Sequence, residues 1–179
     1  MSLYDAAVAE LTAWAPPTTE QAGLRTSYLA HLRDHRDGLT RDCHPDHLTA
    51  SLLVLDGARD RVLLNLHGKY RIWVQFGGHC EADDDTLGAA ALREGVEESG
   101  VPGLTLVGSG PAQLSTHEVR CGPVRPSHHL DVRYVAFAPP GSEPVVSVES
   151  LDVRWFDVTA LPDGLEPPLR DLVSIASRL

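Results

Sequence analysis

The chain has few cysteines and no long hydrophobic run, and each shortage excludes a class of protein. Its 179 residues include three cysteines, Cys43, Cys80 and Cys121. An odd number of widely spaced cysteines does not suit a disulfide framework and is typical of reduced thiols in a cytosol. No segment reaches the roughly eighteen apolar residues of a membrane-spanning helix, and no basic-then-apolar signal opens the chain. We therefore expect a cytoplasmic protein with no membrane contact.

Positive charge is scarce as well. The 15 Lys and Arg residues are outnumbered by 25 Asp and Glu residues, and the formal net charge is −10. This balance argues against nonspecific binding to nucleic acids or membrane surfaces, because both are polyanionic. A nucleotide substrate remains compatible with it, because a bound metal ion inverts the field at its site. The hydrophobic fraction of 42% and the length are ordinary for one globular domain with a modest extension.

The hydrophobic pattern changes from helical to strand-like near residue 46. Residues 3–14 and 18–35 have helical spacing and are separated by a Pro-Pro pair. Short β-rich runs then predict strands at 48–55, 61–66, 71–76, 104–107, 112–119, 129–138 and 153–156. A closing helix is expected at 168–179. This order predicts an α/β fold, a sandwich built on a mixed sheet. We expect residues 1–45 to be a helical extension, packed on the sheet or on a second subunit of a homodimer, and residues 46–179 to be the main domain.

Three closely spaced glutamates are the most informative feature of the chain. Glu94, Glu97 and Glu98 fall on one narrow arc of a predicted helix, because residues at i, i+3 and i+4 are surface neighbours. A divalent cation would remove their mutual repulsion, and ligands that are all oxygen suit Mg²⁺ or Mn²⁺. Considered alone, the three glutamates are explained more simply by a solvated acidic face. The opposite arc is small and apolar enough to lie on a core: Gly88, Ala89, Leu92, Gly95, Val96 and Ser99.

The residues on both sides of this arc favour the metal site. The pair Gly77-Gly78 permits a close backbone approach, and Arg93 can pair with a carboxylate and fix its rotamer. Gly100 ends the helix. Together these residues resemble the box of the Nudix hydrolase family, G-x5-E-x7-R-E-U-x-E-E-x-G-U, in which U is aliphatic. The resemblance covers about residues 46–179 and implies the Nudix fold, an α/β/α sandwich with a mixed sheet.

Two positions depart from the family pattern. The segment between Gly78 and Arg93 is one residue longer, so the isolated glutamate of the pattern corresponds to Asp84 or Asp85. Gly95 stands in place of an aliphatic residue and predicts a tight contact with a neighbouring strand, since glycine in a helix costs about 0.5–1 kcal/mol relative to alanine. Neither departure removes a box glutamate. The N-terminus of the helix is expected to be capped by the aspartate run Asp83, Asp84 and Asp85.

The resemblance implies a metal-dependent hydrolase that cleaves a diphosphate linkage in a nucleoside-diphosphate derivative. It assigns Mg²⁺ binding, with Mn²⁺ able to substitute, to Glu94, Glu97 and Glu98. The carbonyl of Gly78 is a further candidate ligand, and Arg93 would orient Glu94. The partner is then a small-molecule nucleotide. Nucleoside triphosphates, nucleotide sugars, dinucleotides and coenzyme A esters all remain open as substrates.

The general base is left open by the sequence. Glu94 itself is one candidate. A carboxylate on a loop is the other, foremost Glu149 and after it Glu118 or Glu143. Glu81, shortly after the double glycine, is a candidate outer ligand of the metal.

Histidines and cysteines offer further candidates. The set Cys43, His44 and His47 could bind zinc, but such a set without a second cluster more often has no metal-binding role. His128 and His129 are adjacent on a predicted strand, so they face opposite ways and cannot form a pair at one site.

Other activities fit the sequence less well. A Nudix-fold sensor that binds nucleotides without turnover would be favoured by the loss of a box glutamate, and all three are present. An isomerase acting on an isoprenoid diphosphate would need an altered box and a catalytic cysteine. A nucleophilic pair of Cys80 and His79 lacks a residue that orients it. Aromatics in a small domain are more often core than base-stacking, which applies to Tyr70, Trp73, Phe76 and Tyr134.

Overall fold

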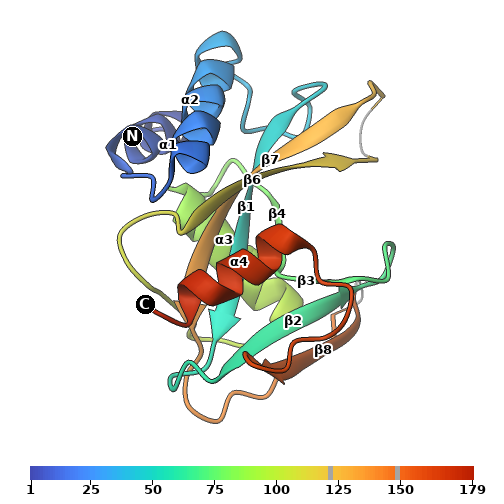
Figure 1. The fold of residues 1–179 in the computed structure, drawn as a ribbon. Helices are drawn as coiled ribbons and strands as arrows, with labels where there is room; N and C mark the ends of the chain where they lie inside the picture. Colours follow the sequence, from blue (N-terminus) through green and yellow to red (C-terminus); the bar gives the residue numbers. More distant parts are fainter. Residues whose placement is uncertain (121–122, 148–149) are drawn as a thin grey trace.

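A mixed β-sheet covered by helices on both faces forms the centre of the molecule (Figure 1). This computed structural model describes residues 1–120, 123–147 and 150–179. In chain order the elements are α1 (Leu3–Ala13), α2 (Thr19–Asp34), β1 (His47–Leu55), β2 (Arg61–His67), β3 (Trp73–Val74), β4 (Phe76–His79), α3 (Leu87–Ser99), β5 (Thr105–Leu106), β6 (Gln113–Val119), β7 (Ser127–Phe137), β8 (Ser150–Asp157) and α4 (Pro167–Ala176). The predicted α/β/α sandwich is confirmed. None of the helices in these ranges is long and apolar enough to span a membrane.

Strands β1 and β7 run parallel at the centre of the sheet. The first half of β1 pairs on its other side with β4 and its end pairs with β2, both antiparallel. Strands β5 and β6 pair with β7, while β3 and β8 pair with β2. The predicted strand at 71–76 is two strands in the structure. The second strand, β4, runs through Gly77 and Gly78, because Ser51 and Ala50 of β1 pair with them.

The two faces of β1 are both buried and differ in composition. Side chains alternate between the faces of a strand. Leu48, Ala50 and Leu52 join an apolar core that also includes residues of α1, α2 and α3. The other face begins with three buried polar residues, His47, Thr49 and Ser51, and only then becomes apolar and packs with α4. Helices α3 and α4 therefore cover opposite faces of the sheet.

Helix α3 is held by its ends and by one close contact. Thr86 accepts a hydrogen bond from the Ala89 amide at 3.0 Å, so the prediction that Asp83, Asp84 and Asp85 cap this helix is wrong. Gly100 ends the helix at φ 68°, as expected. A Cβ at Gly95 would overlap Leu52 of β1, which confirms the predicted tight contact. The predicted core arc is wrong at Val96, which is 37% exposed. The helix instead turns the buried residues Leu87, Ala91 and Gly95 toward the sheet.

The two N-terminal helices pack on the same core as α3. Thr18 caps α2 by accepting a hydrogen bond from the Gln21 amide, which confirms the predicted restart after the proline pair. Leu11, Tyr28 and Leu32 are fully buried. The Gln21 side chain also pairs with the backbone of Leu114 in β6, accepting from its N–H at 2.7 Å and donating to its C=O at 2.9 Å.

Candidate functional site

Strand β4 brings its double glycine against the acidic side of α3. The Gly77 amide donates a hydrogen bond to Glu98 Oε2 at 2.9 Å. A Cβ on Gly78 would lie 2.6 Å from Glu94 Oε1, so only glycine allows the carboxylate to approach the strand this closely. Gly77 has φ +153° and a Cβ there would lie 2.5 Å from Ser51 Oγ. The sequence GG therefore places two box glutamates directly beside the backbone of β4.

Arg93 is the centre of the ionic network on this side of α3. Its guanidinium donates to both oxygens of Asp84, at 3.1 and 3.0 Å. It also donates to Glu94 Oε1 at 3.0 Å and to Glu97 Oε2 at 3.3 Å. A further hydrogen bond, of 2.9 Å, reaches the carbonyl of His79 at the end of β4. The predicted pairing of Arg93 with a carboxylate is thus present, and the arginine ties α3, β4 and the turn between them together.

Burial and the arginine act in opposite directions on the carboxylates. Burial raises the pKa of the Glu94 carboxyl above its usual value, and the hydrogen bond from Arg93 offsets this only in part. Asp84 is also buried, but the hydrogen bonds from Arg93 and from the Glu81 amide outweigh this and lower its pKa. Glu97 is 60% exposed at its side chain and stays in contact with solvent. A cation bound beside the half-buried Glu94 would stabilise the ionised form of its carboxylate.

The structure brings some of the predicted site residues together and leaves others apart. Gly78, Glu94 and Glu98 meet where β4 lies against α3, and Glu97 reaches the same network through Arg93. Glu81 is exposed and lies 3.8 Å from Arg93, at the rim of that network. Of the loop candidates for the general base, Glu143 lies on an exposed loop, but Glu118 does not, because it is an exposed residue of strand β6, paired with His128 of β7. The third, Glu149, lies outside the described residues.

Two of the aromatic candidates belong to the core. Phe76 and Tyr134 are buried in the apolar cluster under α3. Trp73 is half-buried and packs edge-on against Phe156, with ring centroids 4.7 Å apart. Tyr70 is exposed. Trp73 and Tyr70 therefore keep exposed ring surface, which Phe76 and Tyr134 do not.

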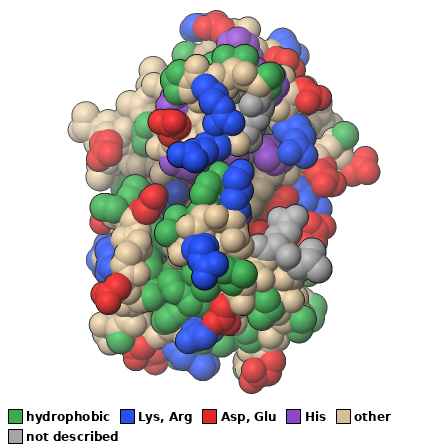
Figure 2. Space-filling view, turned by 90° about the vertical axis from the view of Figure 1, so that its right-hand side faces the viewer, with side chains coloured by type: hydrophobic (Ala, Val, Ile, Leu, Met, Phe, Trp, Pro, Cys, Tyr) green, Lys and Arg blue, Asp and Glu red, His purple; other side chains and the backbone are tan. Residues whose placement is uncertain are grey.

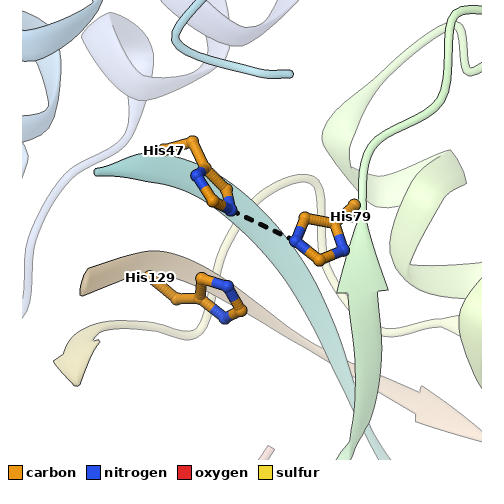
Figure 3. Close-up of side chains that lie close together, drawn as sticks. All are labelled: His47, His79 and His129. Atoms are coloured by element: carbon orange, nitrogen blue, oxygen red, sulfur yellow. Dashed lines mark hydrogen bonds between the residues drawn. The ribbon is translucent and has the colours of Figure 1, made fainter. Parts of the chain in front are cut away.

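A group of histidines that the sequence did not connect lies on the other side of β4. His47 of β1, His79 of β4 and His129 of β7 point toward one another (Figure 3). Burial is the largest cause that lowers the pKa of His79 to about 4 and that of His129 to about 3, so both imidazoles are neutral at neutral pH. The missing signal is strand register, because the three residues are far apart in the chain.

The three residues considered as a zinc set, Cys43, His44 and His47, do not come together, in line with the favoured interpretation that they have no joint metal-binding role. Cys43 lies in a different group, with His35 and Asp37, and contributes only its carbonyl to His47. His47 is the first residue of β1, and its side chain points toward His79 and His129 instead of toward Cys43.

Two further expectations about histidines and cysteines hold. His128 contacts Asp46 at 3.0 Å while His129 joins the histidine group, so the neighbours do face opposite ways. Burial raises the pKa of Cys80 to about 12, so this thiol stays protonated and is not an activated nucleophile.

Figure 2 shows the face that lies on the right-hand side of Figure 1, where histidine side chains reach the surface among arginine and lysine side chains.

Comparisons with known proteins agree with this geometry. The NUDIX domain family model matches residues 45–174. A NUDIX-family hydrolase from Clostridium perfringens is similar in structure, with a TM-score of 0.57 and 22% identity over 74% of this chain and 94% of that chain. The dihydroneopterin triphosphate pyrophosphohydrolase of E. coli gives a TM-score of 0.58 and 18% identity over 71% and 92% of the two chains. An Ap4A hydrolase of C. elegans gives 0.56 and 18% over 73% and 95%. Comparison with curated proteins gives no match.

Proposed function

The chain belongs to the Nudix family, and from this premise we propose that it is a metal-dependent hydrolase that cleaves a diphosphate linkage in a nucleoside-diphosphate derivative. One observation carries the proposal: Arg93 and the double glycine of β4 hold the box glutamates at one place beside the backbone. Arg93 is one positive charge among the four carboxylates of Asp84, Glu94, Glu97 and Glu98, so an excess of negative charge is left that a bound cation would neutralise.

The residues present fit Mg²⁺, with Mn²⁺ as a substitute. The donors are carboxylate oxygens of Glu94, Glu97 and Glu98 together with the backbone carbonyl of Gly78, and hard cations prefer such oxygen ligands. Because Gly78 has no side chain, the Glu94 carboxylate has room to bind the same cation as the backbone carbonyl of this strand. A cation held there supplies charge neutralisation of the phosphoryl oxygens and acidifies an attacking water.

The remaining residues position these donors. Arg93 fixes the rotamer of Glu94, and the paired hydrogen bonds to Asp84 fix the guanidinium in turn. The amide of Gly77 holds Glu98. We assign proton abstraction from the attacking water to Glu94 or to Glu149, the two candidates that the sequence favours most. The substrate is proposed to be a small-molecule nucleotide.

Turnover against a panel of substrates tests the proposal. Nucleoside triphosphates, nucleotide sugars, dinucleotides and coenzyme A esters would each be incubated with Mg²⁺ and with Mn²⁺, and release of phosphate, pyrophosphate or nucleoside monophosphate would be measured. We expect hydrolysis of at least one class that stops when the metal is chelated. Tight nucleotide binding without any turnover would instead support the second candidate, a Nudix-fold sensor, although the complete set of box glutamates favours the enzyme.

A further inference from the structure

Three imidazoles converge at the start of the two central strands. The candidate ligand atoms of His47, His79 and His129 all lie within 4.8 Å of one another. His47 Nε2 and His79 Nε2 are 3.1 Å apart, and the rings of His47 and His129 are 4.9 Å apart between centroids (Figure 3). His47 is 1% exposed, and the other two are half-buried. The group is therefore partly open to solvent and is carried by three strands of the sheet.

Strand register explains why the three side chains meet. His47 is directly opposite His129 in the parallel pair β1–β7, so the two side chains share a face. His79 is opposite Thr49, which is two residues after His47 and faces the same way. Gly78 precedes His79, so the strand alternation turns the histidine group away from the carboxylates of α3. The group is thus backed by sheet and does not depend on a loop.

The hydrogen bond that His47 makes through Nδ1 determines the protonation of Nε2, the ring nitrogen that faces His79. His47 Nδ1 is 3.1 Å from the carbonyl oxygen of Cys43. A carbonyl only accepts hydrogen bonds, so Nδ1 carries the proton and the lone pair of Nε2 points at the other imidazoles. Histidines that bind metals characteristically donate their second N–H to a carbonyl or carboxylate in this way. The tautomer that a metal needs is already fixed.

We propose that His47, His79 and His129 bind one divalent transition-metal ion, and that Zn²⁺ is the ion they take. Zinc bonds to histidine nitrogen at about 2.0–2.1 Å in a tetrahedron, which places the ligand nitrogens about 3.3–3.4 Å apart. The pair His47 and His79 is close to this spacing, and a small side-chain movement brings in His129. Three protein ligands leave the fourth position to water or to an oxygen of a ligand.

The donor chemistry separates this site from the box. Imidazole nitrogen suits Zn²⁺ and its neighbours in the transition series, whereas Mg²⁺ prefers oxygen. The chain therefore offers nitrogen donors on one side of β4 and oxygen donors on the other, and the zinc site is independent of the proposed hydrolase function. The competing account is a group of tilted, neutral imidazoles, with His47 and His79 joined by a hydrogen bond, that takes no metal.

Zinc titration of the full-length protein decides between these accounts. The protein is stripped with chelator, dialysed, and titrated with Zn²⁺ by calorimetry in excess Mg²⁺, which occupies oxygen sites. Co²⁺ serves as a second probe, because its visible absorption is much stronger in a tetrahedral site than in an octahedral one. We expect one Zn²⁺ per chain and no competition by Mg²⁺. His79→Gln and His129→Gln should each weaken binding by more than the about 10- to 100-fold typical of losing a second-shell partner.

Two matched variants serve as controls. His128→Gln makes the same chemical change one residue from His129 on the opposite face, and should leave zinc affinity unchanged. Glu97→Gln weakens the carboxylate side only and should also leave it unchanged. Circular dichroism checks the fold of every variant, and His79→Gln, whose side chain is half-buried, carries the test if His129→Gln does not fold. The proposal is overturned if wild type binds no Zn²⁺, if His79→Gln binds as wild type does, or if Glu97→Gln abolishes binding.

Discussion

The two faces of the central strands β1 and β7 are both buried along most of their length and are stabilised in different ways. On one face Leu48, Ala50 and Leu52 pack against three helices through contacts that have no preferred direction. On the other face Thr49 and Ser51 donate hydrogen bonds to Asp131, at 3.1 and 2.6 Å. A strand that is buried along its whole length, as β1 is, therefore need not be apolar along its whole length.

The polar face is organised around one carboxylate. Asp131 is 1% exposed and accepts two further hydrogen bonds, from Arg133 at 2.8 Å and from Gln75 at 3.3 Å. Arg133 in turn donates to Gln113 of β6. Thr49, Ser51 and Arg133 are held by the two central strands and Gln75 by the link between β3 and β4, so this face depends on each group being present, whereas the apolar face can repack.

Removal of the cover over the apolar face should have the largest effect. We propose that residues 1–45 are an extension integral to the domain, because Leu11, Tyr28 and Leu32 are fully buried in its core. Burial of three such side chains contributes roughly 5–9 kcal/mol, which is comparable with the whole stability of a domain. Deletion of residues 1–40 should therefore give a protein that aggregates or self-associates. A soluble truncated chain with unchanged oligomeric state and melting temperature would contradict the proposal.

Substitutions in the box should change rate without disturbing either face. Glu98→Gln and Glu97→Gln each keep the side-chain shape and remove one negative charge. Metal stabilisation of phosphoryl charge is worth several kcal/mol, and at about 1.4 kcal/mol per tenfold we expect losses on the order of 10²- to 10⁴-fold in kcat. Glu20→Gln on the exposed surface of α2 is the control. Equal turnover by all of these variants and wild type would remove the box from the mechanism.

Asp131→Asn tests the polar face directly. The substitution leaves Arg133 buried without its counter-charge, and breaking a buried ion pair in this way costs about 3–5 kcal/mol. The midpoint of urea unfolding should fall accordingly. The same change at exposed Asp163 should have no measurable effect. Similar midpoints for the two variants would show that the polar face is not held by this carboxylate.

The smallest expected effect is at the closest contact of the apolar face. Gly95→Ala gains about 0.5–1 kcal/mol of helix propensity and loses about 1–3 kcal/mol by crowding Leu52, so a net loss near 1 kcal/mol is expected. Leu52→Val should relieve the crowding. In a double-mutant cycle the alanine should then be less destabilising in the valine background than in wild type. Strict additivity would mean that the two residues are not coupled.

The helix that bears the box was readable from the sequence because its determinants are local. The glutamate spacing, Arg93 and Gly100 all lie within one short segment, and the helix ends where the glycine predicts. The strands were placed to within a few residues for the same reason, since alternation and turn residues act over short distances. The sequence could not predict that Thr86, and none of the neighbouring aspartates, caps the helix. Asp84 binds Arg93 instead, and this contact forms only when the helix is folded.

What the sequence could not provide is strand register. His47 and His129 meet because β1 pairs in parallel with β7, and nothing near either residue encodes that partnership. The polar side chains at 47, 49 and 51 read as an ordinary β-rich run until Asp131 is placed opposite Thr49. Long-range pairing thus determines both the buried charge and the histidine group.

The side chain of Gln21 has a consequence for how this protein behaves at high concentration. Strand β6 pairs on one side with β7 and otherwise presents backbone donors and acceptors that a strand of another molecule could recruit. The carboxamide of Gln21 satisfies both backbone groups of Leu114, as a neighbouring peptide unit would. Helix α2 thereby supplies a substitute for a further strand and blocks intermolecular sheet extension at that point.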